Sequence, residues 1–332
     1  MLNQSLKLNT KIFNDVVEKN STRQGFGEGL LKAGIENENV VALCADLTDS
    51  VKVNIFADKF PNRFVQVGIA EQNMASVASG MASMGKIPFI ASYAIFNPGR
   101  NWEQIRTTIC YNNQPVKIIG SHAGLSVGPD GGSHQALEDI ALTRVLPNMV
   151  VISPCDYIEA KKATVACAKT IDPTYIRLAR NDTPIITTED TSFEIGKAQI
   201  VFVPEIGLAH VGIIATGPIL YKAIMAAHAL EKKGIKIKVM NLSTIKPLDV
   251  DAVIALAKET KAIITVEDHQ IAGGMGSAVA ECLAQNYTVP IEFVGVRNKF
   301  GQSGTPSELE KHYNINTPDI IEKVEKILKR KI

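Results

Sequence analysis

Several side chains that could carry chemistry follow directly after predicted β-strands. Glu71 follows the strand-like run FVQVGIA, His122 follows KIIGS, and Arg180 ends YIRLAR. The same kind of position is held by Asp46, Ser50, Tyr93 and Phe96. In an open parallel sheet, ligands bind beyond the carboxyl ends of the strands. Because packing alone does not require so many charged, hydroxyl and aromatic groups there, the pattern predicts a ligand site.

Glu71 stands near the start of GIAEQNMASVASGMASMG, where a carboxylate enters the first turn of a helix of small residues. An acidic residue at this position commonly complements the helix dipole. The alternative is a buried acid that faces a ligand nitrogen. The residues by themselves leave both interpretations open.

A long glycine-rich loop, HAGLSVGPDGGSHQ, carries His122, Asp130 and His134 between a strand and a helix. Asp-Gly is a common turn pair, and histidines in such a loop can be incidental. The alternative is a cluster of groups that bind a ligand. Here too the spacing alone does not decide between the two.

The elements that must position these groups alternate between strand and helix in the first half of the chain. Runs rich in β-branched residues predict strands at 40–47, 64–69, 87–92, 115–121, 149–153 and 174–180. Helical patterns between them fall at 71–84, 135–145 and 157–169, the second preceded by Ser133 as a possible N-cap. Such alternation predicts a parallel α/β sheet.

A polar stretch at 181–194 then separates this unit from a second one. In that second unit, strands are predicted at 209–217, 236–242, 262–268 and 291–296, and helices at 221–233, 249–260, 277–285 and 318–329. The sequence therefore predicts an α/β protein with two mostly parallel-sheet domains, at 15–183 and 195–332. The linker is predicted at 184–194.

The composition indicates which kinds of binding partner and which cell compartment to expect for this protein. Over 332 residues, 35 Lys and Arg balance 34 Asp and Glu, so we expect no nucleic-acid partner. We expect no membrane span either, because no apolar run reaches about 18 residues. The five cysteines form no CxxC pair and are odd in number, which predicts buried thiols in a cytoplasmic protein rather than disulfides or a zinc site.

Several motifs in order resemble one family. ADLTDS (45–50), GIAEQNM (68–74), PDGGSHQ (129–135) and LARND (178–182) resemble the C-terminal half of transketolase, as do NLSTIKPLD (241–249) and VEDHQIAGGMGSAVAECLA (266–284). That half comprises the pyrimidine-binding domain and the C-terminal domain of thiamine diphosphate enzymes. The resemblance runs from about Ser21 to the end of the chain.

The resemblance implies a set of cofactor contacts. In the family, a glutamate of the GIAEQN helix hydrogen-bonds a ring nitrogen of the aminopyrimidine of thiamine diphosphate, and here that residue is Glu71. Phe96 corresponds to the aromatic residue that packs on the ring, and Tyr93 stands where transketolases commonly have another Phe. A planar π-face suits a planar heterocycle. The resemblance also assigns His134 to the cofactor region and to proton transfer, so Glu71 and His134 are the expected catalytic residues.

The resemblance further implies a sugar-phosphate site. Two arginines, a serine and a histidine hold the phosphate in the family, and their counterparts here are Arg23, Ser50, His122 and Arg180. Guanidinium, hydroxyl and imidazole groups suit a phosphate dianion. Asp130 corresponds to the residue that holds a sugar hydroxyl and selects its stereochemistry.

One part of the family pattern is missing from the sequence. No GDG followed by an Asn-rich metal motif, the family's signature for holding diphosphate and a divalent cation, occurs in the chain. We therefore expect Mg²⁺ and the diphosphate to be held mainly by a separate N-terminal transketolase subunit, with no metal ligand on this chain. By family analogy the assembly would be an α2β2 heterotetramer.

These expectations favour the second subunit of a split transketolase. It would move a two-carbon ketol unit from a ketose phosphate, such as xylulose 5-phosphate, to an aldose phosphate in carbohydrate metabolism. Alternatives are the β-subunit of a 2-oxoacid dehydrogenase, a 1-deoxyxylulose-5-phosphate synthase, and a split transketolase for a rarer ketose phosphate. A different class is a nucleotide-binding module whose GGMG (273–276) opens a helix, although GGMG lacks the GxGxxG spacing.

Overall fold

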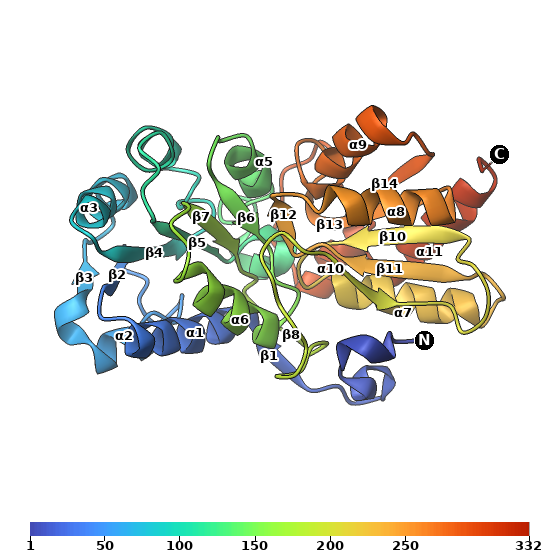
Figure 1. The fold of residues 1–332 in the computed structure, drawn as a ribbon, viewed down its shortest axis with the longest axis horizontal. Coiled ribbons are helices and arrows are strands. Elements are labelled where there is room, and N and C mark those ends of the chain that lie inside the picture. The colour runs from blue at the N-terminus through green and yellow to red at the C-terminus, as the bar shows by residue number, and fades with distance from the viewer. Residues whose placement is uncertain (332) are drawn as a thin grey trace.

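The computed structural model describes residues 1–331 and contains two largely parallel sheets that lie side by side (Figure 1). Helices cover both sheets, which confirms the predicted α/β class with two mostly parallel-sheet units. Long runs of Val, Ile, Leu and Ala form the strands, since a sheet covered on both faces needs apolar residues on both.

The first sheet has seven strands in the order β12-β6-β7-β5-β4-β2-β3. Its strands are β2 (Val40–Cys44), β3 (Phe64–Gln66), β4 (Ile87–Tyr93), β5 (Lys117–Ser121), β6 (Val150–Ile152), β7 (Thr174–Arg177) and β12 (Thr244–Lys246). All pairs are parallel except β12 with β6. The carboxyl ends of β2, β4, β5 and β7 therefore meet at one edge.

Helices on this sheet are α1 (Thr22–Glu36), α2 (Asn54–Lys59), α3 (Glu71–Ser83), α4 (Trp102–Gln104), α5 (Asp139–Arg144) and α6 (Tyr157–Cys167). The helices α1 and α6 pack so closely that a Cβ at Gly29 would lie 2.7 Å from the carbonyl oxygen of Lys161. Glycine on this face of α1 lets the two backbones approach. The close packing fixes the start of α1, which carries Arg23.

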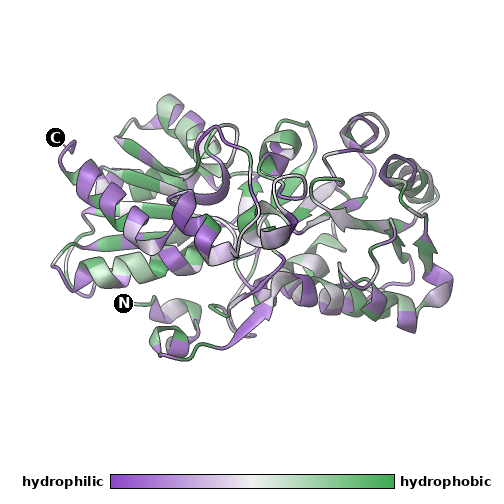
Figure 2. Ribbon diagram, turned by 180° about the vertical axis from the view of Figure 1, so that it is seen from behind, coloured by the Kyte–Doolittle hydropathy of each residue, from purple (hydrophilic) through white to green (hydrophobic). Residues whose placement is uncertain are grey.

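The second sheet has five strands in the order β14-β13-β10-β11-β9. Its strands are β9 (Gln199–Phe202), β10 (Val211–Ala215), β11 (Ile237–Asn241), β13 (Ile263–Gln270) and β14 (Ile291–Val296), and only β9 is antiparallel to its neighbour. The helices are α7 (Leu220–Glu231), α8 (Val250–Thr260), α9 (Met275–Asn286), α10 (Pro306–His312) and α11 (Thr317–Leu328). Figure 2 shows apolar residues gathered in the strands and hydrophilic ones on the outer helices.

The helix predicted at 135–145 begins only at Asp139, and Ser133 does not cap it. Gln135 is buried, and its side-chain amide donates to the carbonyl oxygens of Gly128 and Gln302. These contacts hold residues 131–137 in the loop. The prediction of an N-cap at Ser133 was therefore wrong, because tertiary contacts outweigh local helical pattern there.

The sequence patterns did not predict two short polar strands. The strand β1 (Lys19–Ser21) pairs antiparallel with β8 (Asp182–Pro184), which overlaps the polar stretch after the first unit. Beyond it, the Asp156 carboxylate accepts backbone hydrogen bonds from Ile186 and Thr187. The polar stretch is thus anchored to the first unit rather than free.

The residues before β1 pack on the second sheet. Leu2, Leu8 and Ile12 are buried in the same core as Phe202, and the Phe13 ring stacks on His228 at 4.4 Å between centroids. In Figure 1 this N-terminal segment lies beside the second sheet before the chain crosses to the first. All five cysteines are buried and free, as predicted. Within residues 1–331, no helix has the length and apolar character to cross a membrane.

Candidate active site

Glu71 is the first residue of α3, and its side chain is only 2% exposed. Its Oε2 atom has no hydrogen-bond partner within the described part of the chain. The nearest charge is the guanidinium of Arg100, with 3.5 Å between Nη1 and Oε2. A buried carboxylate oxygen without a donor is costly, so this atom is suited to a ligand that brings an N–H group.

Two buried amides position the loop that faces Glu71. The Asn101 side chain donates to the backbone carbonyl of Glu71 at 3.1 Å and to Asn97 Oδ1 at 2.9 Å. Asn97 in turn donates to the carbonyls of Ile90 and Ile119, which lie in β4 and β5. The start of α3 is therefore tied to the middle of the first sheet.

Four rings form a cluster that Arg100 connects to this carboxylate, since its guanidinium carbon lies 5.2 Å from the Phe96 ring centroid. The Tyr93 ring stacks on His122 at 3.8 Å and is nearly parallel to Phe96, with centroids 6.3 Å apart. His134 meets Phe96 edge-on at 5.7 Å. Strand register explains the first contact, because Tyr93 on β4 lies opposite Ser121 on β5. The cluster offers flat aromatic faces and two imidazoles at one strand edge.

His122 is buried and adopts a left-handed backbone conformation with φ of 55°. Such a conformation is uncommon for a residue other than glycine and recurs at functional sites. Its Nδ1 atom lies 2.9 Å from Ser121 Oγ. Burial, followed by the nearby positive charges of Arg23 and Arg180, lowers the pKa of His122 to about 3. The imidazole is therefore neutral at physiological pH.

The two arginines meet beside this histidine. Arg23 donates to the backbone carbonyl of Arg180 from Nε and Nη2, at 3.0 and 2.6 Å, and to that of Ser50. Arg180 forms an ion pair with Asp130 at 3.6 Å. Burial lowers the pKa of Arg23, and the neighbouring Arg180 lowers it further. An anion between the two guanidinium groups would relieve this repulsion.

The recorded contacts join the nine predicted site residues into two groups. Glu71 connects through Arg100 to the ring cluster, whereas Arg180 connects to Arg23 and Asp130. Ser50 joins them only through its backbone carbonyl, and no contact of its hydroxyl is recorded. Asp46 is exposed, and its backbone N–H donates to Gln66. Glu71 with the rings and the two arginines with Asp130 thus form two groups, related by the effect of the arginines on the pKa of His122, and Asp46 lies apart from these contacts.

Sequence reasoning missed Arg100, Asn97 and Asn101, all in the segment FNPGRN that follows the predicted strand at 87–92. Their roles depend on the fold of that loop, which places two of them inside the protein. A signal was available, since asparagine side chains directly after a buried strand need partners. Helical or strand periodicity could not have supplied it.

The helix at GGMG does not offer an open anion site. The backbone N–H groups of Met275 and Gly276 donate to the Glu267 carboxylate at 2.7 and 2.9 Å. Burial raises the pKa of Glu267 to about 7, against the effect of these hydrogen bonds. The protein's own carboxylate takes the place that a nucleotide phosphate would need, which contradicts the nucleotide-binding alternative.

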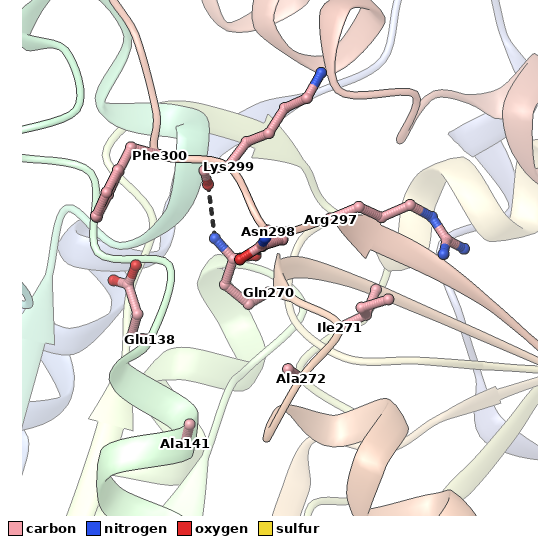
Figure 3. Close-up of a pocket in the computed structure, with 9 residues that line it drawn as sticks. All are labelled: Glu138, Ala141, Gln270, Ile271, Ala272, Arg297, Asn298, Lys299 and Phe300. Atoms are coloured by element: carbon pink, nitrogen blue, oxygen red, sulfur yellow. Dashed lines mark hydrogen bonds between the residues drawn. The ribbon is translucent and has the colours of Figure 1, made fainter.

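A separate pocket of about 620 Å³ lies between α5 and the loops after β13 and β14 (Figure 3). Its lining includes Glu138, Arg297 and Phe300, and the Gln270 amide donates to the Lys299 carbonyl at 2.7 Å. None of the predicted site residues line it. Over residues 1–331, no group of three or more His, Cys, Asp or Glu is arranged to hold a metal ion.

Comparison with known proteins agrees with this architecture. Residues 18–185 match the family model of the transketolase pyrimidine-binding domain, and residues 208–320 match that of the transketolase C-terminal domain. The two matches define the class as enzymes built on the pyrimidine-binding and C-terminal domains that thiamine diphosphate enzymes share. The chain belongs to the transketolase family.

Relatives of similar length support the assignment. A transketolase C-terminal section of Methanocaldococcus jannaschii is 42% identical, over 93% of this chain and 96% of that protein. A 6-deoxy-6-sulfo-D-fructose transketolase subunit of a Clostridium species is 36% identical, over 95% and 97%. A solved structure described as a split gene transketolase, inactive beta4 tetramer, is 41% identical with a TM-score of 0.87, over 94% of this chain and 99% of that one.

Proposed function

We propose that the chain is the C-terminal subunit of a split, thiamine diphosphate-dependent transketolase. It provides the aminopyrimidine side of the cofactor site and the sugar side of the substrate site. The observation that carries this proposal is the buried Glu71 Oε2 atom without a hydrogen-bond partner, connected through Arg100 to the Phe96 ring. Both features match what a planar ring with an N–H group requires.

When bound, thiamine diphosphate supplies the nucleophilic carbon and the electron sink for breaking a C–C bond. Glu71 would accept a hydrogen bond from the aminopyrimidine ring and shift a proton at that nitrogen. Phe96 would pack on the ring, with Tyr93 beside it. His134, edge-on to Phe96, would contact substrate hydroxyls and move a proton.

The sugar would lie toward the arginines. Arg23, Arg180 and the neutral His122 would bind the anionic end of a ketose phosphate, helped by the Ser50 hydroxyl. Asp130, whose Oδ1 atom lies 3.6 Å from Arg180 Nη1, would accept a hydrogen bond from a sugar hydroxyl. The expected donor resembles xylulose 5-phosphate and the acceptor is an aldose phosphate, which suits a role in the pentose phosphate pathway.

A second donor class has specific support. The Clostridium relative is named for 6-deoxy-6-sulfo-D-fructose, whose sulfonate is also an oxyanion. Two guanidinium groups bind either anion through N–H donors. A ketose with a sulfonate in place of the phosphate is therefore the alternative substrate.

The subunit arrangement follows from the same family analogy. A separate N-terminal subunit would hold the diphosphate and Mg²⁺, and the pair would assemble as a cytoplasmic α2β2 heterotetramer. Five free buried thiols suit a reducing compartment. The domains are proposed at 15–183 and 195–332, with a linker at 184–194.

The test is ketol transfer from xylulose 5-phosphate to ribose 5-phosphate with thiamine diphosphate and Mg²⁺. Three samples are assayed: the chain alone, the chain with its N-terminal partner, and the Glu71→Gln variant of the chain with the same partner. Activity only in the mixture, and lost in the variant, supports the proposal. Activity of the chain alone contradicts the partner requirement, and decarboxylation of a 2-oxoacid in place of ketol transfer favours the dehydrogenase subunit.

A further inference from the structure

The guanidinium of Arg100 touches both groups that the proposed cofactor site offers to the aminopyrimidine. Its Nη1 atom lies 3.5 Å from Glu71 Oε2, the buried oxygen that lacks a hydrogen bond. Its central carbon lies 5.2 Å from the centroid of the Phe96 ring. One planar group thus faces both the carboxylate and the aromatic face.

A guanidinium and an aminopyrimidine share the features that these contacts recognise. Both are flat, delocalised groups that carry N–H donors in their plane, and arginine stacks on aromatic rings. A buried carboxylate without a compensating charge or donor is costly, and Arg100 supplies the charge. On the proposed function, the ring and the guanidinium would compete for Glu71 Oε2 and for the Phe96 ring.

Arg100 is free enough to leave. Its side chain is 52% exposed, and within residues 1–331 the ion pair with Glu71 and the contact with Phe96 are the only side-chain contacts recorded for it. Its backbone N–H donates to the Phe96 carbonyl at 3.1 Å, which keeps the loop in place when the side chain moves. Displacement therefore requires a rotamer change and no rearrangement of the fold.

We propose that Arg100 is an internal competitor for the aminopyrimidine site, whose guanidinium holds Glu71 and the Phe96 face until the cofactor displaces it. This inference rests on the proposed function of Glu71 and Phe96. The affinity for thiamine diphosphate is then set partly by this chain's own side chain. The competing contacts amount to one half-exposed ion pair and one cation–π contact.

The test measures the dissociation constant of thiamine diphosphate with Mg²⁺ by isothermal titration calorimetry on the complex with the N-terminal subunit. Arg100→Ala should bind the cofactor about three- to tenfold more tightly, since both competing contacts are weak and exposed. Arg100→Lys keeps the charge without the planar stack and should fall between. Arg297→Ala removes the same charge from the second domain and should leave the constant unchanged.

An unchanged dissociation constant in Arg100→Ala overturns the inference, because the Arg100 side chain then does not compete with the cofactor. Weaker binding of the cofactor by Arg100→Ala also overturns it, since Arg100 would then contribute to cofactor binding. Glu71→Ala separates this inference from the proposed function. If it binds the cofactor as tightly as the wild type, the proposed role of Glu71 fails, whatever Arg100→Ala does; if it loses the cofactor and Arg100→Ala has no effect, only the inference fails.

Discussion

Two buried glutamates, one in each sheet region, show opposite uses of the same residue. Glu71 and Glu267 are 2% and 1% exposed; Glu71 is the first residue of α3, whereas Glu267 lies in β13 and contacts the first turn of α9. Both Glu267 oxygens accept backbone N–H groups of α9. The Oε2 atom of Glu71 accepts none and faces an exposed guanidinium. Burial alone therefore does not distinguish the two glutamates, whereas their hydrogen-bond partners do.

The surroundings of the two glutamates extend this contrast. Near Glu267, Asp268 accepts the backbone N–H of Leu125 at 3.1 Å. Asn241, at the end of β11, donates to Glu159 of α6 at 2.8 Å. These polar groups join the second sheet to the first unit. In the first sheet, aromatic rings, imidazoles and guanidinium groups follow the strands instead, and these are the strand ends for which we propose a binding role.

The largest expected effect comes from Glu71→Gln. The amide keeps the size of the side chain but cannot exchange a proton with the ring, so turnover of the complex should fall about 10²- to 10⁴-fold. The melting temperature should stay close to that of the wild type. Steady-state kinetics and calorimetry on the same sample check both. Near-normal turnover would remove Glu71 from the proposed machinery.

Glu267→Gln should give the reverse pattern. An amide can accept only one of the two backbone hydrogen bonds and turns its NH₂ toward the other donor, so the free energy of unfolding should fall by about 1–3 kcal/mol. Turnover per folded complex should hardly change. Urea denaturation and active-site titration measure the two quantities. Loss of turnover with intact stability would mean that the contrast between the two glutamates is wrong.

Arg180→Ala tests the sugar end of the first region. Losing a charge-assisted contact should raise KM for a phosphorylated ketose about ten- to a hundredfold, and should hardly affect the dephosphorylated ketose. Arg330→Ala removes a cation that pairs with Glu292 in the second domain and should leave both values unchanged. An equal rise in KM for the phosphorylated and the dephosphorylated ketose would show that Arg180 does not bind the anion.

The smallest effect is a pH dependence of stability that arises from buried carboxyls. Burial raises the pKa of Glu159 and of Glu267 to about 7 from an ordinary value of 4.5. Between these values the folded state binds more protons than the unfolded state, so the free energy of unfolding contributed by these groups falls as pH rises. Urea titrations at pH 5, 6 and 7 measure this slope.

Glu267→Gln should flatten that slope, because one of the two groups no longer titrates. Glu292 provides a control whose pKa shifts in the opposite direction. Burial would raise its pKa, but hydrogen bonds from Lys326 and Arg330 outweigh burial and lower it. Glu292→Gln should therefore leave the slope between pH 5 and 7 nearly unchanged, because Glu292 is ionised there in both states. A slope that Glu267→Gln does not alter would mean that other groups govern stability in this range.

Much of this arrangement could be predicted because local sequence and final structure agree. Apolar runs such as VVALC became β2, and Glu71 opens its helix as expected. The remainder depends on contacts distant in sequence. Gln135 is held by the carbonyl of Gln302, which delays the start of α5, and Arg100 meets Glu71 only because a loop folds back on α3. No periodicity in the sequence records such contacts.

The strand β12 has a consequence for how the protein forms during synthesis. Thr244–Lys246 covers the edge of β6, with further backbone contact between Ser153 and Ser243 at 2.8 Å. An uncovered strand edge is a template for aggregation. Because β9, β10 and β11 precede β12 in the chain, the ribosome delivers most of the second sheet before the first sheet gains its last strand. The first sheet is therefore complete only after three strands of the second sheet have been synthesised.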